Sequence, residues 1–129
     1  MELDMKFEEH KPPRTFEVGC RKTILKDCAH IELAPDEQVT FKTVSGTEYD
    51  VVRKSWGYYA TPSLNGRLQE FGLRGVLVRN LNAKFYLLLV EEGKEERFQH
   101  YLDIEQLTVV CWLDNDKELE TLAEKLNSS

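Results

Sequence analysis

Residues 76–90 read VLVRNLNAKFYLLLV, which consists of two apolar runs on either side of a polar loop. Each run has the length of a short strand, and residues 80–82 between them have the composition of a turn. Nearly continuous apolar runs are typical of strands that are covered on both faces. The stretch therefore predicts two buried strands, with Phe85, Leu87 and Leu89 in the core.

Downstream of this pair, the sequence predicts a helix and a third buried strand. The helix begins near Lys94, and its apolar residues recur at helical spacing: Phe98, Tyr101 and Leu102. The strand is the apolar run 107–113. We expect Val109 and Cys111 of this run to complete the core. A final helix is predicted after Asn115, because Glu118 follows at the spacing of a capping box. Its apolar stripe contains Leu119, Leu122, Ala123 and Leu126.

Upstream of residue 76, period-2 alternation predicts strands. Two alternating runs flank the pair Ser45-Gly46, and glycine supplies the positive φ that a tight turn requires, so we expect a β-hairpin here. Residues 15–18 and 30–33 also alternate, and Pro35 with Asp36 marks a turn.

A helix is predicted from Thr61, since threonine can cap a helix and Pro62 suits its first position. Leu64, Leu68 and Phe71 follow at helical spacing, and Gly72 is a plausible stop. The order of elements predicts an α+β fold with a mixed, mainly antiparallel sheet and about three helices. An open β-barrel with peripheral helices is the alternative.

Chain length and composition indicate one globular domain of 129 residues, with 1–13 as a flexible arm or an edge extension because it is polar and ends in two prolines. The net charge of -6 argues against a nucleic-acid partner, which needs a basic face. No apolar run is long enough for a membrane span, and the N-terminus lacks the apolar segment of a signal peptide. Three cysteines, an odd count, favour a reducing compartment.

Residues 54–67 are the leading candidate for a binding site, because aromatic and polar side chains gather there between a predicted strand and a predicted helix. The start of a helix presents unpaired N–H groups that bind anions. Ser63 and Arg67 are four residues apart, so they share a helix face and an anion there would meet both side chains. The ligand-binding residues expected on this basis are Trp56, Tyr58, Tyr59, Thr61, Ser63, Asn65 and Arg67. The alternative is that the aromatics fill the core and Thr61 only caps the helix.

Other residues with suitable chemistry have stronger structural explanations. Cys20, Cys28 and His30, with Cys111, could bind zinc or supply a nucleophile and its base, but their spacing matches no standard site and no orienting acid can be assigned. We therefore expect reduced cysteines, no metal and no cofactor. The acidic pairs 91–92 and 95–96 flank a helix start, where negative charge is stabilised by the helix dipole.

Two segments, GCRKTILKDC at 19–28 and WGYYATPSLNGRL at 56–68, resemble a family of short, uncharacterised bacterial proteins that are often encoded among genes for cell-surface polysaccharide biosynthesis. The resemblance covers about residues 19–113. It implies a cytoplasmic bacterial protein that works near sugar nucleotides or the enzymes that use them. No activity or site residue comes with it.

Three functions remain open from the sequence. The first is a non-enzymatic binding or accessory module, which recognises an anionic small molecule or a partner protein. The second is a small enzyme that acts on a phosphorylated sugar. The third is a structural subunit that forms a homodimer through a sheet edge.

Overall fold

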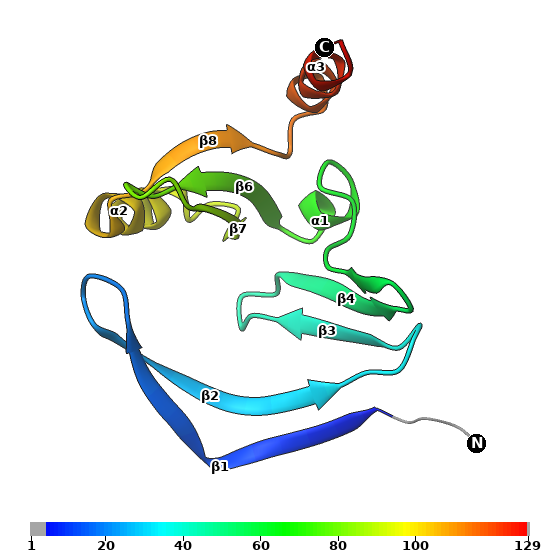
Figure 1. Ribbon diagram of the computed structural model, residues 1–129, viewed down its shortest axis with the longest axis vertical. Coiled ribbons are helices and arrows are strands. Elements are labelled where there is room, and N and C mark those ends of the chain that lie inside the picture. Colours follow the sequence, from blue (N-terminus) through cyan, green and yellow to red (C-terminus); the bar gives the residue numbers. More distant parts are fainter. Residues whose placement is uncertain (1–4, 129) are drawn as a thin grey trace. The chain divides into compact units, whose positions relative to one another are not determined.

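The computed structural model describes residues 5–128. This part of the chain contains eight strands and three helices, and its strands form three antiparallel sheets of which none closes into a barrel (Figure 1). The α+β fold class is therefore confirmed, with three separate sheets in place of one mixed sheet. No described helix is long and apolar enough to cross a membrane.

The chain divides into two compact units. Among the described residues, the first unit contains 5–39 and 50–60, and the second contains 40–49 and 61–128. The division passes through the hairpin of β3 (Gln38–Lys42) and β4 (Glu48–Lys54), whose tip belongs to the second unit. The single domain that the chain length predicts stays a prediction.

In the first unit, β1 (Lys6–Val18) pairs antiparallel with β2 (Thr23–Glu32). From Lys6 onward, the segment expected to be an arm or an edge extension is therefore part of a paired strand. The register shifts between Glu9 and Arg14, where β1 bends (Figure 1). Two prolines lie in this interval, and proline has no N–H to donate to a ladder, so the shift falls where the sequence cannot maintain regular pairing.

The predicted hairpin around Ser45-Gly46 is confirmed. The backbone N–H of Thr43 donates to the carbonyl of Thr47 over 3.0 Å, and Gly46 has a φ of +99°. In the first unit, β4 continues into a turn and pairs antiparallel with β5 (Gly57–Tyr59).

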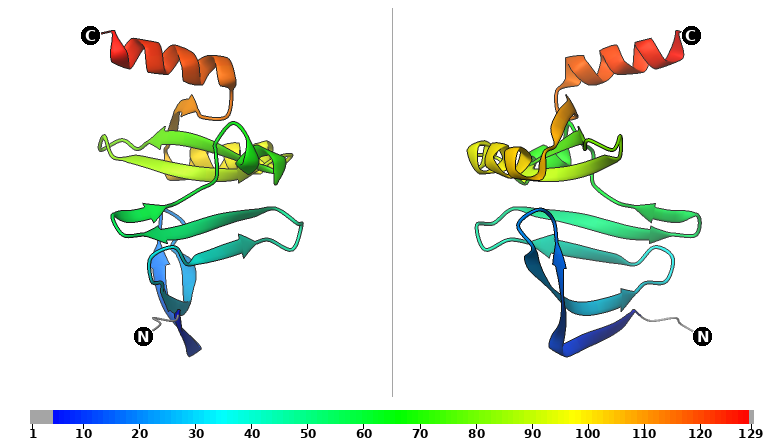
Figure 2. Two further views of the ribbon diagram at one scale, coloured as in Figure 1. Left: turned by 90° about the vertical axis from the view of Figure 1, so that its right-hand side faces the viewer. Right: turned by 60° about the vertical axis from the view of Figure 1, so that its left-hand side comes forward.

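In the second unit, β6 (Leu73–Arg79) lies between β7 (Phe85–Glu91) and β8 (Thr108–Trp112). The helix α2 (Glu95–Glu105) packs on one face of this sheet, as the two views of Figure 2 show. The core forms between them and consists of Val76, Val78, Val90 and Leu102. The core is centred on β6 because this strand alone of the three has neighbours on both sides.

The core predicted from the apolar runs is wrong in the two outer strands. Leu87 is 52% exposed, Phe85 and Val109 are also exposed, and Leu89 and Cys111 are only half-buried. Side chains alternate between the two faces of a strand, so Leu87 points away from α2 while Leu88 packs against the core. A continuous apolar run in β7 therefore does not mean that both of its faces are covered.

Of the two other helices predicted in this unit, one differs from expectation and one agrees with it. The helix predicted from Thr61 begins only at the four-residue α1 (Arg67–Glu70), because the chain bends at 61–62 and forms a turn at 64–66 instead. The C-terminal helix α3 (Asp116–Asn127) is as expected, and the side chain of Asn115 accepts a hydrogen bond from the Glu118 N–H over 3.0 Å. None of the described residues of α3 is buried: Leu119 of its apolar stripe is half-buried, and Leu122, Ala123 and Leu126 are exposed.

Candidate functional site

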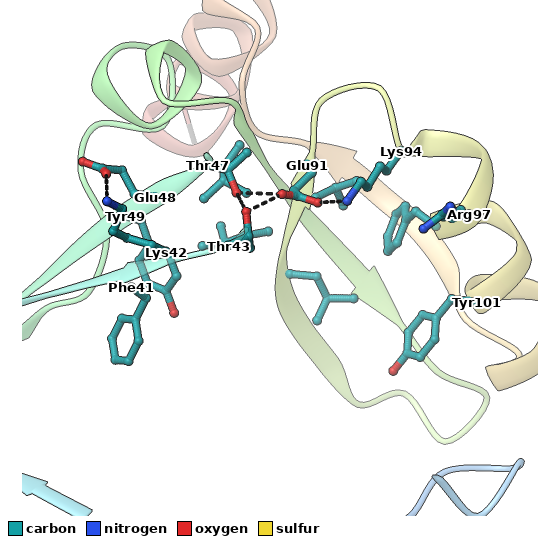
Figure 3. A pocket seen from close by; sticks show the side chains of 15 residues that line it. Phe41, Lys42, Thr43, Thr47, Glu48, Tyr49, Glu91, Lys94, Arg97 and Tyr101 are labelled. Atoms are coloured by element: carbon teal, nitrogen blue, oxygen red, sulfur yellow. Dashed lines mark hydrogen bonds and ion pairs between the residues drawn. The ribbon is translucent and has the colours of Figure 1, made fainter. Parts of the chain in front are cut away.

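A pocket of about 490 Å³ lies in the second unit, between α2, β7 and the tip of the β3–β4 hairpin (Figure 3). We call it the α2 pocket. Small-molecule sites usually have volumes of roughly 300–1,000 Å³, so its size suits a small ligand. Its walls are formed by Phe41, Lys42, Thr43, Thr47, Glu48, Tyr49, Leu73, Leu88, Leu89, Val90, Glu91, Lys94, Arg97, Phe98 and Tyr101.

Lys94, which caps α2, and three residues of the helix form one wall of the pocket. They are spaced at i, i+3, i+4 and i+7, which places them on one face of a helix. Two are cationic and two are aromatic, in the order Lys94, Arg97, Phe98 and Tyr101. The ring of Phe98 also packs against Trp112 of β8, with centroids 5.9 Å apart, and this contact holds the helix on the sheet.

The remaining walls are mainly apolar. Consecutive residues of β7, Leu88 to Val90, contribute one side. The hairpin contributes the paired rings of Phe41 and Tyr49, whose centroids are 5.3 Å apart. An aromatic or aliphatic body of matching size would lose water-exposed surface on both sides by entering this space.

A single carboxylate attaches the hairpin tip to β7. Oε1 of Glu91 accepts hydrogen bonds from the hydroxyls of Thr43, Ser45 and Thr47, over 2.7, 2.5 and 2.8 Å. Its other oxygen, Oε2, pairs with the ammonium of Lys94, which precedes the first residue of α2 (Figure 3). Glu91 thereby connects all three segments that form the pocket.

The same contacts keep this carboxylate ionised. The ammonium of Lys94, followed by the three hydroxyls, holds the pKa of Glu91 far below its usual range. The hairpin tip also approaches Gly72 closely, since a Cβ on this residue would lie 2.9 Å from Cγ2 of Thr47. A side chain at position 72 would push the tip away from the sheet.

A network on the other side of α2 fixes the start of this helix. Arg74 on β6 donates to Asp114 over 2.5 Å and to Glu95 over 3.3 Å, and its guanidinium lies 4.0 Å from the ring centre of Trp112. Asp114 is buried, and its carboxylate raises the pKa of Arg74. The start of α2 is thus held from two sides, which orients the cations that it presents to the pocket.

The cations of the pocket are not equivalent. Lys94 pairs with Glu91, and Lys42 lies 4.0 Å from Glu48. For Arg97, which is exposed at the rim, no ion pair or hydrogen bond is seen among the residues 5–128 that the structure describes. Arg97 is therefore the cation best placed to meet an anionic group on a ligand.

The binding residues predicted within 54–67 are divided between the two units. Trp56, Tyr58 and Tyr59 belong to the first unit and are exposed, and Trp56 is 71% exposed. Thr61, Ser63, Asn65 and Arg67 belong to the second unit. The alternative that these aromatics fill the core is wrong, since all three are exposed.

The predicted anion site at Thr61–Ser63 lacks the helix start on which it was based. The backbone N–H of Arg67 donates a hydrogen bond to the hydroxyl of Ser63 over 2.8 Å. This N–H is therefore not available to an anion. The guanidinium of Arg67 lies 4.8 Å from the ring centre of Phe71, and the amide of Asn65 donates to Asp116 over 2.9 Å. Each of these polar groups thus has a partner within the chain.

The cysteines are free thiols and are spread along the chain. Cys20 and Cys28 are exposed in the first unit, whereas Cys111 is half-buried on β8 in the second. His30, which the sequence groups with the cysteines, lies instead beside Glu8 and His10 across the β1–β2 hairpin.

Sequence reasoning missed the α2 pocket because its walls come from three separate segments. The i, i+3, i+4, i+7 pattern of α2 was visible, but only the tertiary structure brings the hairpin tip against it. Comparison of the chain with protein-family models, curated proteins and solved structures finds no match. The candidate site therefore rests on its geometry alone.

Proposed function

We propose that this chain is a non-enzymatic binding module, and that its ligand is a small molecule with an apolar body and one anionic group. The observation that carries the proposal is the α2 pocket, with apolar and aromatic walls and Arg97 at its rim. Apolar walls with a few placed polar groups are the usual composition of small-molecule sites. We thus place the binding site for the anionic ligand expected from the sequence on α2, and not at Ser63 and Arg67.

The net charge of -6 opposes anion binding at long range, so the local charge must dominate. Salt screens exposed charges beyond roughly 8–10 Å, which limits the repulsion from distant carboxylates. Among the nearby acids, Glu91 and Glu48 each lie close to a lysine of the same pocket. This pairing leaves Arg97 as the uncompensated charge at the rim.

A matched pair of probes tests the proposal. We expect 2-naphthoate to bind more tightly than 2-naphthylmethanol, which has a similar shape and no charge, when both are titrated into the full chain by calorimetry. Hydrogen bonds to charged groups contribute about 1.5–3 kcal/mol, so Arg97→Gln should weaken naphthoate binding by about tenfold or more. The same substitution should leave the alcohol unaffected.

Two control variants separate the charge from the apolar walls. Arg79→Gln removes an exposed arginine of β6 that does not line the pocket, and naphthoate binding should not change. Tyr101→Ala removes part of the apolar wall, so both probes should bind more weakly. Equal affinities of wild type and Arg97→Gln for naphthoate would remove the basis of the proposal.

A partner protein is a second candidate, favoured by the apolar face of the β1–β2 hairpin. Phe7 lies opposite Ile31, and Phe16 lies opposite Leu25, and all four side chains are exposed. Exposed apolar surface of this kind is typical of interaction sites, and a homodimer is the simplest case. We expect Phe16→Glu to lower the fraction of the chain that sediments as a dimer, whereas Val44→Glu should leave this fraction unchanged.

The bacterial origin, the cytoplasmic location and the link to polysaccharide or sugar-nucleotide metabolism are also part of the proposal. They rest on the resemblance of 19–28 and 56–68 to polysaccharide-associated bacterial proteins. A phosphorylated sugar lacks the apolar body that the α2 pocket favours. The enzyme alternative therefore receives no support from this pocket.

A further inference from the structure

Three potential metal ligands meet on the β1–β2 hairpin of the first unit. Glu8 and His10 are two residues apart on β1, and Glu8 is the direct cross-strand neighbour of His30 on β2. One ligand atom from each of the three side chains lies within 4.8 Å of the other two. Direct cross-strand neighbours are the closest pairs in a sheet, which brings Glu8 and His30 together. His10 joins them from the start of the stretch where the register of β1 shifts.

The spacing of the first two groups suits a transition-metal ion. Nε2 of His10 lies 3.4 Å from Oε1 of Glu8. Ligand atoms at ~2.0–2.1 Å from a tetrahedral zinc ion lie about 3.3–3.4 Å from each other. A zinc ion thus fits between these atoms with little movement of either side chain.

The backbone selects the form of His10 that binds metal. Nδ1 of His10 lies 3.0 Å from the carbonyl oxygen of Asp27, and a carbonyl can only accept, so Nδ1 carries the hydrogen. Nε2, which lies toward Glu8, is then the nitrogen available to a metal ion. This arrangement, in which a ligating histidine donates its other N–H to a carbonyl, is a regular feature of zinc sites. The side chain of His10 is only 11% exposed, so its orientation is fixed by packing.

Arg14 contacts the cluster directly, and it is paired with an acid. Nη2 of Arg14 is 3.4 Å from Nε2 of His30, and the guanidinium forms a two-contact pair with the carboxylate of Asp27. The carboxylate of Asp27 offsets the charge of Arg14, and its Oδ2 also lies 3.4 Å from Nε2 of His30. Glu8 then supplies the negative charge that favours a dication.

We propose that Glu8, His10 and His30 form a binding site for a zinc-class divalent transition metal. Two imidazoles and a carboxylate are suitable ligands for such ions, and three protein ligands leave a fourth position for water or a small anion. Glu8 and His30 also line a cavity of about 510 Å³, together with Lys6, Arg53 and Tyr58. Among the described residues, β1 and β2 form a sheet of two strands, and such a sheet is only marginally stable alone. The bound ion cross-links the two strands and thereby stabilises the hairpin.

The experiment is a titration of the full chain with zinc chloride, after metal removal by a chelator. We expect one zinc ion per chain, and slower hydrogen exchange of the β1 and β2 amides when it is bound. Glu8→Gln and His30→Ala should each lower the zinc affinity at least about tenfold. Even residues that only hydrogen-bond to zinc ligands typically change the metal affinity about 10–100-fold when they are mutated. Both side chains are exposed, so both variants should keep the fold, and far-UV circular dichroism checks this.

Two controls separate this site from other zinc ligands of the chain. His100→Ala removes the remaining histidine, on α2, and should leave zinc affinity unchanged. A variant with all three cysteines replaced by serine should also retain the site. Wild-type affinity in folded His30→Ala, loss of binding in the cysteine variant alone, or absence of stoichiometric zinc binding would each overturn the proposal.

Discussion

The hydroxyl of Thr47 donates a hydrogen bond over 2.8 Å to Glu91, a residue 44 positions later in the chain. This contact, with those of Thr43 and Ser45 to the same oxygen, holds the hairpin tip on the end of β7. It also sets the position of Phe41 and Tyr49, whose rings line the α2 pocket. The pocket therefore depends on a polar attachment at one end as well as on apolar packing.

The first prediction concerns the pH dependence of this attachment. The pKa of Glu91 is lowered in the folded chain, so the ionised form stabilises the fold at neutral pH. This stabilisation is lost as the pH falls below 4.5, the ordinary pKa of glutamate, toward the lower value of the folded state. We expect Glu91→Gln to unfold at a lower urea concentration than wild type at neutral pH, with a difference that shrinks in acid. A difference that is the same at every pH would contradict the role of the charge.

The second prediction concerns Ser63 and Arg67. Ser63→Ala should destabilise the fold by about 1 kcal/mol in urea unfolding, because the Arg67 N–H loses its acceptor, whereas Ser63→Thr keeps the hydroxyl and should change little. Arg67→Ala should leave the affinity for 2-naphthoate unchanged. A large loss of affinity in Arg67→Ala would return the anion site to the segment that the sequence favours.

The third prediction compares two leucines of the second unit. Leu102 is fully enclosed between α2 and the sheet, so Leu102→Ala should cost about 2–5 kcal/mol of unfolding free energy. Leu87→Ala should cost less than about 1 kcal/mol, because this side chain is half exposed. Similar losses for the two variants would mean that the outward face of β7 is covered after all.

The fourth prediction concerns the apolar stripe of α3. Leu126 is 69% exposed, and surface substitutions usually change stability by less than about 0.5 kcal/mol. We therefore expect Leu126→Lys to have no measurable effect on thermal unfolding. A clear destabilisation would show that this helix is covered in solution.

The sequence predicted the elements that depend on local patterns. The turn at Ser45-Gly46, the strand pair around 80–82 and the cap at Asn115 each depend on neighbouring residues, and all three are confirmed. The helix predicted from Thr61 is wrong, because capping residues and Pro62 are also compatible with the turns that the chain forms there. A local sequence pattern distinguishes a helix from a turn only when its residues are unfavourable in one of the two.

Burial and sites depend on tertiary neighbours, which periodicity does not specify. An apolar run in β7 is compatible with a central or an outer strand, and only the pairing with β6 distinguishes them. The three ligands on the β1–β2 hairpin were missed because 1–13 was expected to be an arm, so Glu8 and His10 were not placed opposite His30. The Glu-x-His spacing was visible in the sequence, but its partner strand was not.

The most direct test of the central claim is to locate the bound probe by NMR. In a titration of isotope-labelled chain with 2-naphthoate, we expect saturable chemical-shift changes at Arg97, Phe98 and Tyr101 of α2 and at Tyr49 of the hairpin. Ser63 and Arg67 should not shift. Shifts that gather at Ser63 and Arg67, or the absence of saturable shifts around α2, would contradict the assignment of the α2 pocket as the binding site.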